Sequence, residues 1–296
     1  KAQKAEKRQK LFANKEKFEN ELKEKEEELA KITAKLSEKE REIEEKKAKV
    51  EGYTDEKLDE WVNDYCMKIK PFVCDTGAFL KEAQKSGKKI MFEAQLGALR
   101  DIDYGIFPYT SSSSNISAYA PIGAGVPGVK VDNTIGIIKA YSSCVGEGPF
   151  TCELFGEEGD RLREAGGEYG AATGRPRRVG GFDVIASKYG VETQGATSLA
   201  LTKLDVLSYL DRIPVCVGYT YKGELLNRFP MGVALANAQP VYEYFDGWKC
   251  DISGCRTFDA LPENARKYVR FIEEAVGCPI EYVSVGAERD AYIKMF

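Results

Sequence analysis

The sequence predicts an α/β protein with a mainly parallel central sheet and flanking helices, preceded by a long, charged helical segment. Two observations predict this architecture. Short apolar runs alternate with amphipathic stretches between residues 88 and 296, as expected where strands alternate with helices. Residues 1–50 instead contain 16 Lys or Arg and 13 Glu, with no Gly or Pro. We therefore expect a helical segment over residues 1–87 and an α/β body over residues 88–296.

The charged segment has an ordered pattern of apolar residues. Leu22, Leu29, Leu36 and Ile43 recur every seven residues, which predicts one or two long helices with a narrow apolar seam. Lysines interrupt the companion positions of this repeat and weaken a free coiled coil. Two interpretations stay open: a helical arm that packs on its own domain, or a coiled coil that dimerises.

The next elements follow from local signals. Thr54 is suited to cap a helix that begins at Asp55 and ends before Pro71. Strands are expected at residues 88–92, 135–141, 198–201, 213–221 and 280–285. Helices are expected at residues 182–189, 205–210 and 262–276.

The helix at residues 262–276 has the clearest pattern. Pro262 suits the first turn, and Gly277 suits the stop. Its buried face should consist of Ala265, Tyr268, Val269, Ile272 and Val276.

Composition excludes several function classes. The 296 residues carry a net charge of −4, which argues against a nucleic-acid partner because such surfaces are usually basic. No apolar run reaches the roughly 18 residues that a membrane helix needs, and no leader opens the chain. We expect no membrane partner, a cytoplasmic location, and reduced thiols for the eight cysteines. Because the first residue is Lys1, we also expect a piece of a longer chain.

Two familiar site types are not encoded. The chain has no histidine and no C-x-x-C pair, so no metal ligands are predicted. Residues 123–128 match G-x-G-x-x-G, but a serine-rich loop precedes them and Pro127 lies inside, which indicates an ordinary loop. No G-x-x-x-x-G-K phosphate loop is present.

Three segments carry candidate binding chemistry. Thr202-Lys203-Leu204-Asp205 follows a predicted strand, where α/β sheets bind ligands, and the carboxylate could accept the N1–H and N2–H₂ donors of guanine. The alternative is a capped helix start. The arginines of residues 174–178 could clamp an anion or form a solvated turn. The hydroxyls of residues 111–114 could bind phosphate or ribose, or could belong to a flexible loop.

Taken in order, the motifs of residues 88–296 resemble the adenylosuccinate synthase family, and residues 11–87 fit that family loosely. The matching segments are residues 92–97, 101–103, 107–113, 139–141, 145–150, 170–178, 201–205, 240–248 and 283–286. The resemblance implies an incomplete version of the P-loop GTPase-like nucleotide hydrolase architecture. It implies a ligase that converts IMP, L-aspartate and GTP to adenylosuccinate, GDP and phosphate in AMP synthesis.

The resemblance also implies GTP as co-substrate, Mg²⁺ and a homodimer in which an arginine reaches the partner's IMP site. The family's catalytic Asp base, His acid, phosphate loop and Mg²⁺ ligands belong to an N-terminal portion that this sequence lacks. We therefore assign no catalytic or metal residues and expect this chain alone to be inactive.

Individual roles follow from the matched motifs. GTP would be bound by Lys203, Leu204, Asp205, Arg177, Ser284, Val285 and Gly286. Aspartate would be bound by Ala171, Ala172, Thr173, Gly174, Arg175, Pro176 and Arg177. IMP would be bound by Gln95, Ser111 and Arg175.

Two departures from the family pattern matter. Gln95 stands one place before the family's usual Gln, and Ala172 stands where the family commonly has Thr. The competing function is a non-catalytic guanine-nucleotide-binding protein, or an interaction protein that uses the helical segment as a coiled coil.

Overall fold

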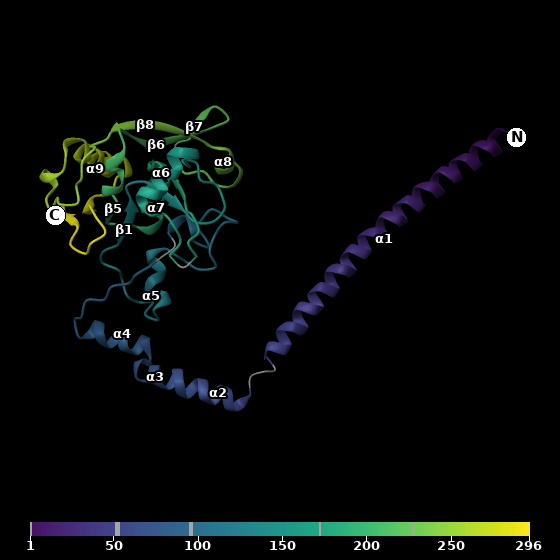
Figure 1. The fold of residues 1–296 in the computed structure, drawn as a ribbon, viewed down its shortest axis with the longest axis horizontal. Coiled ribbons are helices and arrows are strands. Elements are labelled where there is room, and N and C mark those ends of the chain that lie inside the picture. The colour runs from purple at the N-terminus through teal and green to yellow at the C-terminus, as the bar shows by residue number, and fades with distance from the viewer. Residues whose placement is uncertain (1, 51–53, 95–96, 172, 227) are drawn as a thin grey trace. The chain divides into compact units, whose positions relative to one another are not determined.

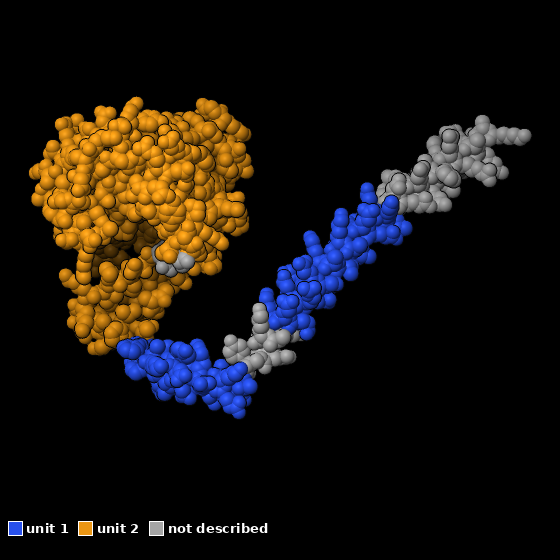
Figure 2. Space-filling model, viewed as in Figure 1, with its two compact units in different colours: residues 1–74 blue, residues 75–296 orange. Residues whose placement is uncertain are grey.

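The computed structural model divides the chain into two compact units, residues 1–74 and 75–296 (Figure 2). It describes residues 2–50, 54–94, 97–171, 173–226 and 228–296, with side chains of the first helix over residues 22–46. The boundary expected after residue 87 stays a prediction.

Apart from Thr54, Val73 and Cys74, the described residues of unit 1 are helical. Helix α1 spans Ala2–Val50 and confirms one long helix (Figure 1). The predicted cap at Thr54 is also confirmed, because its hydroxyl accepts a hydrogen bond from the Lys57 amide at 3.3 Å. The elements that follow are α2 (Asp55–Trp61), a π-helical turn (Val62–Cys66), α3 (Met67–Ile69) and a 3-10 turn (Lys70–Phe72).

The apolar seam of α1 is exposed. Leu22, Leu29, Leu36 and Ile43 each keep at least half of their surface in solvent. Two lysines of the companion positions are paired within the helix, Lys25 with Glu28 at 2.9 Å and Lys39 with Glu42 at 3.1 Å. Among the described residues, no helix combines the length and apolarity that a membrane crossing requires.

Unit 2 begins with short helices and loops. These are α4 (Thr76–Lys85), 3-10 turns at Ala98–Arg100 and Ser117–Tyr119, and α5 (Ala120–Gly123). The strand expected at residues 88–92 is wrong: this stretch is irregular. A short apolar run becomes a strand only when a neighbour pairs with it, and no described strand does so here.

The central sheet contains three parallel strands. Its order is β1 (Ile135–Lys139), β5 (Ser198–Thr202), β9 (Ile280–Ser284) and β10 (Tyr292–Lys294), with β10 antiparallel to β9. Lys139 lies opposite Thr202, and Leu201 lies opposite Val283. The carboxyl ends of the parallel strands therefore meet at one edge.

A second sheet is built on β6 (Arg212–Tyr221). It pairs in parallel with β4 (Phe182–Asp183) and antiparallel with β7 (Glu224–Leu226) and β8 (Gln239–Asp246). A separate hairpin-like pair joins β2 (Ser142–Cys144) to β3 (Arg178–Gly180). Phe182 and Asp183 were expected to begin a helix; instead they form β4, and Asp183 caps α7.

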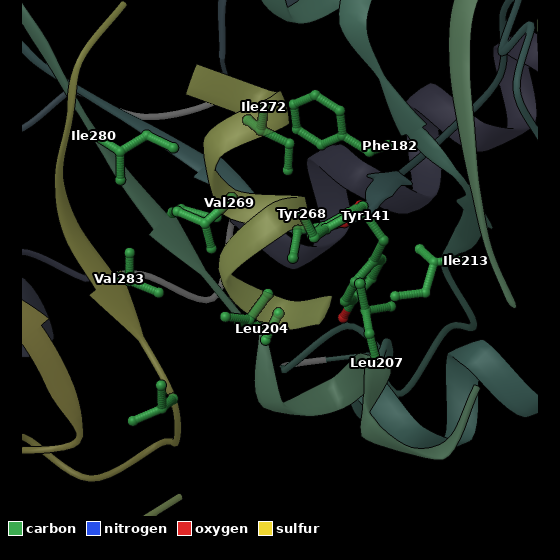
Figure 3. Packing of buried hydrophobic residues seen from close by; sticks show 14 of the residues in the cluster. Tyr141, Phe182, Leu204, Leu207, Ile213, Tyr268, Val269, Ile272, Ile280 and Val283 are labelled. Atoms are coloured by element: carbon green, nitrogen blue, oxygen red, sulfur yellow. The ribbon is translucent and has the colours of Figure 1, made fainter. Parts of the chain in front are cut away.

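Helices flank these sheets. They are α6 (Gly156–Gly166), α7 (Val184–Gln194), α8 (Gly232–Asn237), α9 (Glu263–Val276) and 3-10 turns at Asp205–Tyr209 and Phe258–Ala260. The buried stripe predicted for α9 is confirmed at all five positions, and Gly277 ends the helix at φ 75°. Figure 3 shows Val269 on the side of the helix toward Ile280 and Val283 of β9, and Ile272 beside Phe182.

We predict that Ile272→Ala lowers the free energy of unfolding by about 2–5 kcal/mol, because Ile272 is fully buried and its truncation leaves a cavity. Urea denaturation followed by circular dichroism measures the change. Lys267→Ala on the same helix removes an exposed pair with Glu263 and should change little. Equal effects of the two substitutions would contradict the packing of α9.

Candidate functional site

The candidate site begins where β1, β5 and β9 end. Lys203 follows β5 with a left-handed φ of 60°, which turns the chain sharply into the 3-10 turn that starts at Asp205. The Leu204 amide donates to the carbonyl of Ser284 at 3.3 Å, so the ends of β5 and β9 are joined. The structure thus brings together the residues predicted to contact guanine.

Asp205 is a partly buried carboxylate. Burial raises its pKa above the ordinary value, while the backbone amides of Asp205 and Val206 and the charge of Lys203 oppose the rise. It forms no ion pair within the part of the chain that the structure describes. The Lys203 ammonium donates to the Gly166 carbonyl at 2.6 Å, which anchors the lysine stem beside this turn.

The loop after β9 is fixed by its own hydrogen bonds. The Ser284 hydroxyl donates to the Gly286 carbonyl at 2.9 Å, and the Val285 amide donates to the Ala291 carbonyl at 2.9 Å. Val285 is buried, whereas Ser284 and Gly286 are partly exposed. This loop is therefore held in place, and its partly exposed residues Ser284 and Gly286 follow the strand end that is joined to the turn before Asp205.

A buried carboxylate, Glu168, organises the cations beside this edge. Its Oε1 accepts from the Lys139 ammonium at 2.7 Å and the Tyr141 hydroxyl at 2.6 Å, and its Oε2 accepts from Arg177 at 3.0 Å. Burial alone would raise the pKa of Glu168, but these hydrogen bonds outweigh burial and leave it below the ordinary value. Glu168 is therefore held ionised by two cations, Lys139 and Arg177, and by one neutral hydroxyl, that of Tyr141.

Sequence reasoning missed Glu168. One signal existed: Gly166 and Gly167 precede it at the end of a helix, and an arginine-rich loop follows. A Cβ at Gly166 would collide with the Tyr141 hydroxyl, so this glycine is required for Tyr141 to reach Glu168. That contact joins residues 27 positions apart, which no local pattern reveals.

The arginine-rich loop is tied to the same cluster. The Gly170 amide donates to the Arg175 carbonyl at 2.8 Å, the Gly174 amide donates to the Gly170 carbonyl at 2.7 Å, and the Arg177 amide donates to the Glu168 carbonyl at 2.8 Å. The described residues from Ala171 to Pro176 are exposed, and Ala172 lies outside the described residues.

The three arginines of this segment have different surroundings. Arg178 is bound by Glu153, with Nε–Oε1 at 2.9 Å, and it donates to the Gly148 carbonyl at 2.8 Å, so it stabilises the fold. Arg177 is held by Glu168, yet its Nε is buried and has no hydrogen-bond partner among the described residues. The Arg175 side chain is exposed and is the most accessible of the three to a ligand.

The serine-rich loop forms a third set. The Ser111 hydroxyl donates to the Ser113 carbonyl at 3.1 Å and accepts from the Asn115 side chain at 3.2 Å. Buried Asp101 accepts from the Asp103 and Tyr104 amides at 2.9 Å each. Burial raises the pKa of Asp101, but such backbone hydrogen bonds outweigh burial and lower it. Gln95 lies outside the described residues.

Hydrogen bonds connect the serine loop with the arginine loop. The Ser111 amide donates to the Arg100 carbonyl at 2.8 Å, and Arg100 donates to the Glu147 carbonyl at 3.1 Å. Arg178 donates to the carbonyl of Gly148, in the same short loop as Glu147. The described residues among those predicted to bind IMP, aspartate and guanine are therefore parts of one connected region. Its Lys and Arg side chains suit anions, and Asp205 suits a ligand with paired N–H donors.

No described group of three or more Cys, Asp or Glu residues could hold a metal ion. The Mg²⁺ that the family resemblance implies is therefore not assigned to residues of this chain.

Comparisons with known proteins point to one family. A family profile described as adenylosuccinate synthetase matches residues 1–293. The curated adenylosuccinate synthetase of Thermoanaerobacter sp. (strain X514) is 47% identical over 244 residues, covering 82% of this chain and 57% of the relative. That of Pelobacter propionicus is 48% identical over 240 residues, covering 81% and 56%.

A solved structure gives the same result. The fully ligated adenylosuccinate synthetase from Plasmodium falciparum superposes with a TM-score of 0.78 at 38% identity, covering 82% of this chain and 59% of that one. The chain thus spans somewhat more than half the length of these relatives. The extent of the profile match and these identities show that the chain belongs to the adenylosuccinate synthetase family.

Proposed function

We propose that this chain supplies the guanine-binding and aspartate-binding part of an adenylosuccinate synthetase. That ligase uses GTP to join L-aspartate to IMP, and it releases adenylosuccinate, GDP and phosphate in AMP synthesis. The observation that carries the proposal is the position of Asp205, a partly buried carboxylate without an ion pair among the described residues, at the shared carboxyl edge of β5 and β9.

Asp205 would distinguish guanine from adenine. A carboxylate can accept one hydrogen bond from guanine N1–H and a second from N2–H₂, whereas adenine presents no such pair. The two donors would compensate the loss of water that raises the pKa of Asp205. Lys203 would place its stem on the base plane, Leu204 would support the turn from the core, and residues 284–286 would flank the base.

Arg177 would contact a substrate anion through the exposed part of its guanidinium, since the side chain is 31% exposed although its Nε is buried. Glu168 holds the guanidinium at 3.0 Å, which fixes its orientation. Glu168 also holds Lys139 at 2.7 Å, so one carboxylate would position two cations. We therefore propose Glu168 as a positioning residue: it touches no substrate but orients groups that do.

The aspartate substrate would lie on the loop from Ala171 to Arg177. Arg175, which is exposed and carries a planar pair of N–H donors, suits a carboxylate bidentately. Thr173 and Gly174 would contribute a hydroxyl and backbone N–H groups, while Pro176 would stiffen the loop. IMP would contact Arg175, the Ser111 hydroxyl and Gln95.

The remaining chemistry needs groups that this chain does not provide. Phosphorylation of the IMP 6-oxygen makes a good leaving group for attack by the aspartate amine. The family's His acid has no counterpart in a sequence with no histidine, and no phosphate-loop motif is present. We propose that this chain alone binds nucleotide without turnover. We also propose that the working protein uses Mg²⁺, is a homodimer and is cytoplasmic.

We predict that Asp205→Asn reduces the preference for GDP over ADP roughly 10- to 100-fold, because a charged pair of hydrogen bonds is lost. Competition against a fluorescent guanine nucleotide measures both affinities. Because burial raises the pKa of Asp205, the wild-type preference should fall with acidification at a higher pH than for an ordinary Asp.

Asp251→Asn is the matched control for Asp205→Asn. Asp251 is an exposed acid whose charge acts on Asp205, so this variant removes a nearby charge without removing the acceptor. Its guanine preference should equal that of the wild type. If Asp205→Asn kept the wild-type preference for GDP over ADP, the proposed recognition of guanine by Asp205 would be overturned.

We predict that Glu168→Gln lowers the free energy of unfolding by about 3 kcal/mol, since two partly buried cations lose their counter-charge. The pKa of Glu168 is lowered in the folded state, so its stabilisation is complete above pH 4.5 and is lost as the pH falls through the lowered pKa. Urea denaturation between pH 3 and 7 should show a larger acid loss of stability in the wild type than in Glu168→Gln, and weaker GDP binding should accompany the substitution.

Glu192→Gln, at an exposed position of α7, is the control and should leave both stability and its pH dependence unchanged. A Glu168→Gln protein with wild-type stability and nucleotide affinity would contradict the positioning role.

We predict no adenylosuccinate from this chain supplied with IMP, aspartate, GTP and Mg²⁺, while GDP binding remains measurable. Absorbance and chromatography of the products check the first part, and calorimetry checks the second. Steady product formation by the purified chain would refute the expected inactivity.

A further inference from the structure

Unit 2 contains a cavity of about 230 Å³ between α6, the 3-10 turn Asp205–Tyr209 and the second sheet. Its floor is apolar and consists of Tyr141, Leu162, Phe182, Leu207 and Ile213. Tyr141, Phe182, Leu207 and Ile213 lie together on one side of α9 (Figure 3). An apolar cavity of about 150 Å³ can hold benzene, so this one has room for a larger ring system.

The mouth of the cavity carries two arginines stacked on tyrosines. The Arg161 guanidinium lies 5.3 Å from the ring centre of Tyr209, and the Arg212 guanidinium lies 5.0 Å from that of Tyr244. All four residues line the cavity. A cation–π contact does not use the N–H donors of a guanidinium, so these donors can still bind an anion.

These arginines are not neutralised locally. Neither side chain forms an ion pair or hydrogen bond with another described residue. Most other arginines of unit 2 do form such contacts, and Arg175 is an exception. Two acids also line the mouth, but Asp211 is paired with Lys249 at 3.1 Å, which leaves Glu158 as the opposing charge. The mouth therefore favours an anion over a cation.

We propose that this cavity is a second ligand site, which binds a planar aromatic molecule of about two rings that carries one carboxylate or a similar anionic group. The rings enter the apolar floor, and Tyr209 and Tyr244 line the mouth. Arg161 and Arg212 bind the anionic group. The site is separate from the Asp205 edge, although Tyr141 contributes to both regions through its ring and its hydroxyl.

The test uses 6-fluoro-2-naphthoate as the probe, followed by ¹⁹F NMR on the full chain. Saturable binding at one site is expected. Arg161→Gln and Arg212→Gln should each weaken it about fivefold or more, because a charge-assisted contact at a partly exposed site is lost. Both arginines are exposed, so the variants should fold, and thermal unfolding checks this.

Arg270→Gln is the matched control, since Arg270 also stacks on an aromatic ring, Phe258 at 4.6 Å, but does not line the cavity. It should bind like the wild type. A neutral probe of the same shape, 2-fluoro-6-methylnaphthalene, should bind at least fivefold more weakly than the naphthoate, and this comparison needs no variant.

Two results would overturn the proposal. One is an unchanged affinity for the naphthoate in both arginine variants, and the other is an affinity for the neutral probe equal to that for the naphthoate. Loss of binding in Asp205→Asn, or displacement by GDP, would place the probe at the nucleotide edge and would also overturn it. If the protein bound the naphthoate normally but did not bind GDP, the second site would be supported and the proposed function would be contradicted.

Discussion

One buried carboxylate determines the arrangement of the site. Glu168 is inaccessible to solvent, and it accepts hydrogen bonds from Lys139 at the end of β1, Tyr141 beyond it and Arg177 in the arginine loop. A buried charge is costly unless it is paired and hydrogen-bonded, so these segments must keep their positions together. The same requirement explains Gly166, where any side chain would displace Tyr141.

The parallel register of the central sheet is the second constraint. Because β1, β5 and β9 run in the same direction, Lys139, Lys203 and Ser284 emerge at one edge although they are far apart in the chain. Each strand alone would present one or two polar groups. Together they form an edge with cations and a partly buried acid, which suits a ligand that carries both anionic groups and N–H donors.

The cavity near Arg161 follows from the same packing. Tyr141 turns its hydroxyl toward Glu168 and its ring toward the space between α6 and β6. Because its hydroxyl is already bound to Glu168, it adds no polar group to the cavity, and the floor of the cavity is apolar. Polar character is confined to the mouth, where the guanidinium groups rest on tyrosine rings.

Local sequence signals are sufficient to predict several elements of the fold. Helix α1, the cap at Thr54, and the buried stripe and glycine stop of α9 follow from periodicity and capping, which act within a few residues. Local sequence signals also predict which segments carry binding chemistry, because residues such as those at 202–205 and 174–178 stand out, and these roles stay predictions. Long-range contacts explain why residues 88–92 form no strand, why Phe182 and Asp183 pair with β6, why Arg178 is bound by Glu153, and why Glu168 organises the cations. These outcomes depend on partners distant in the chain, and a sequence pattern contains no information on which distant group fills a given space.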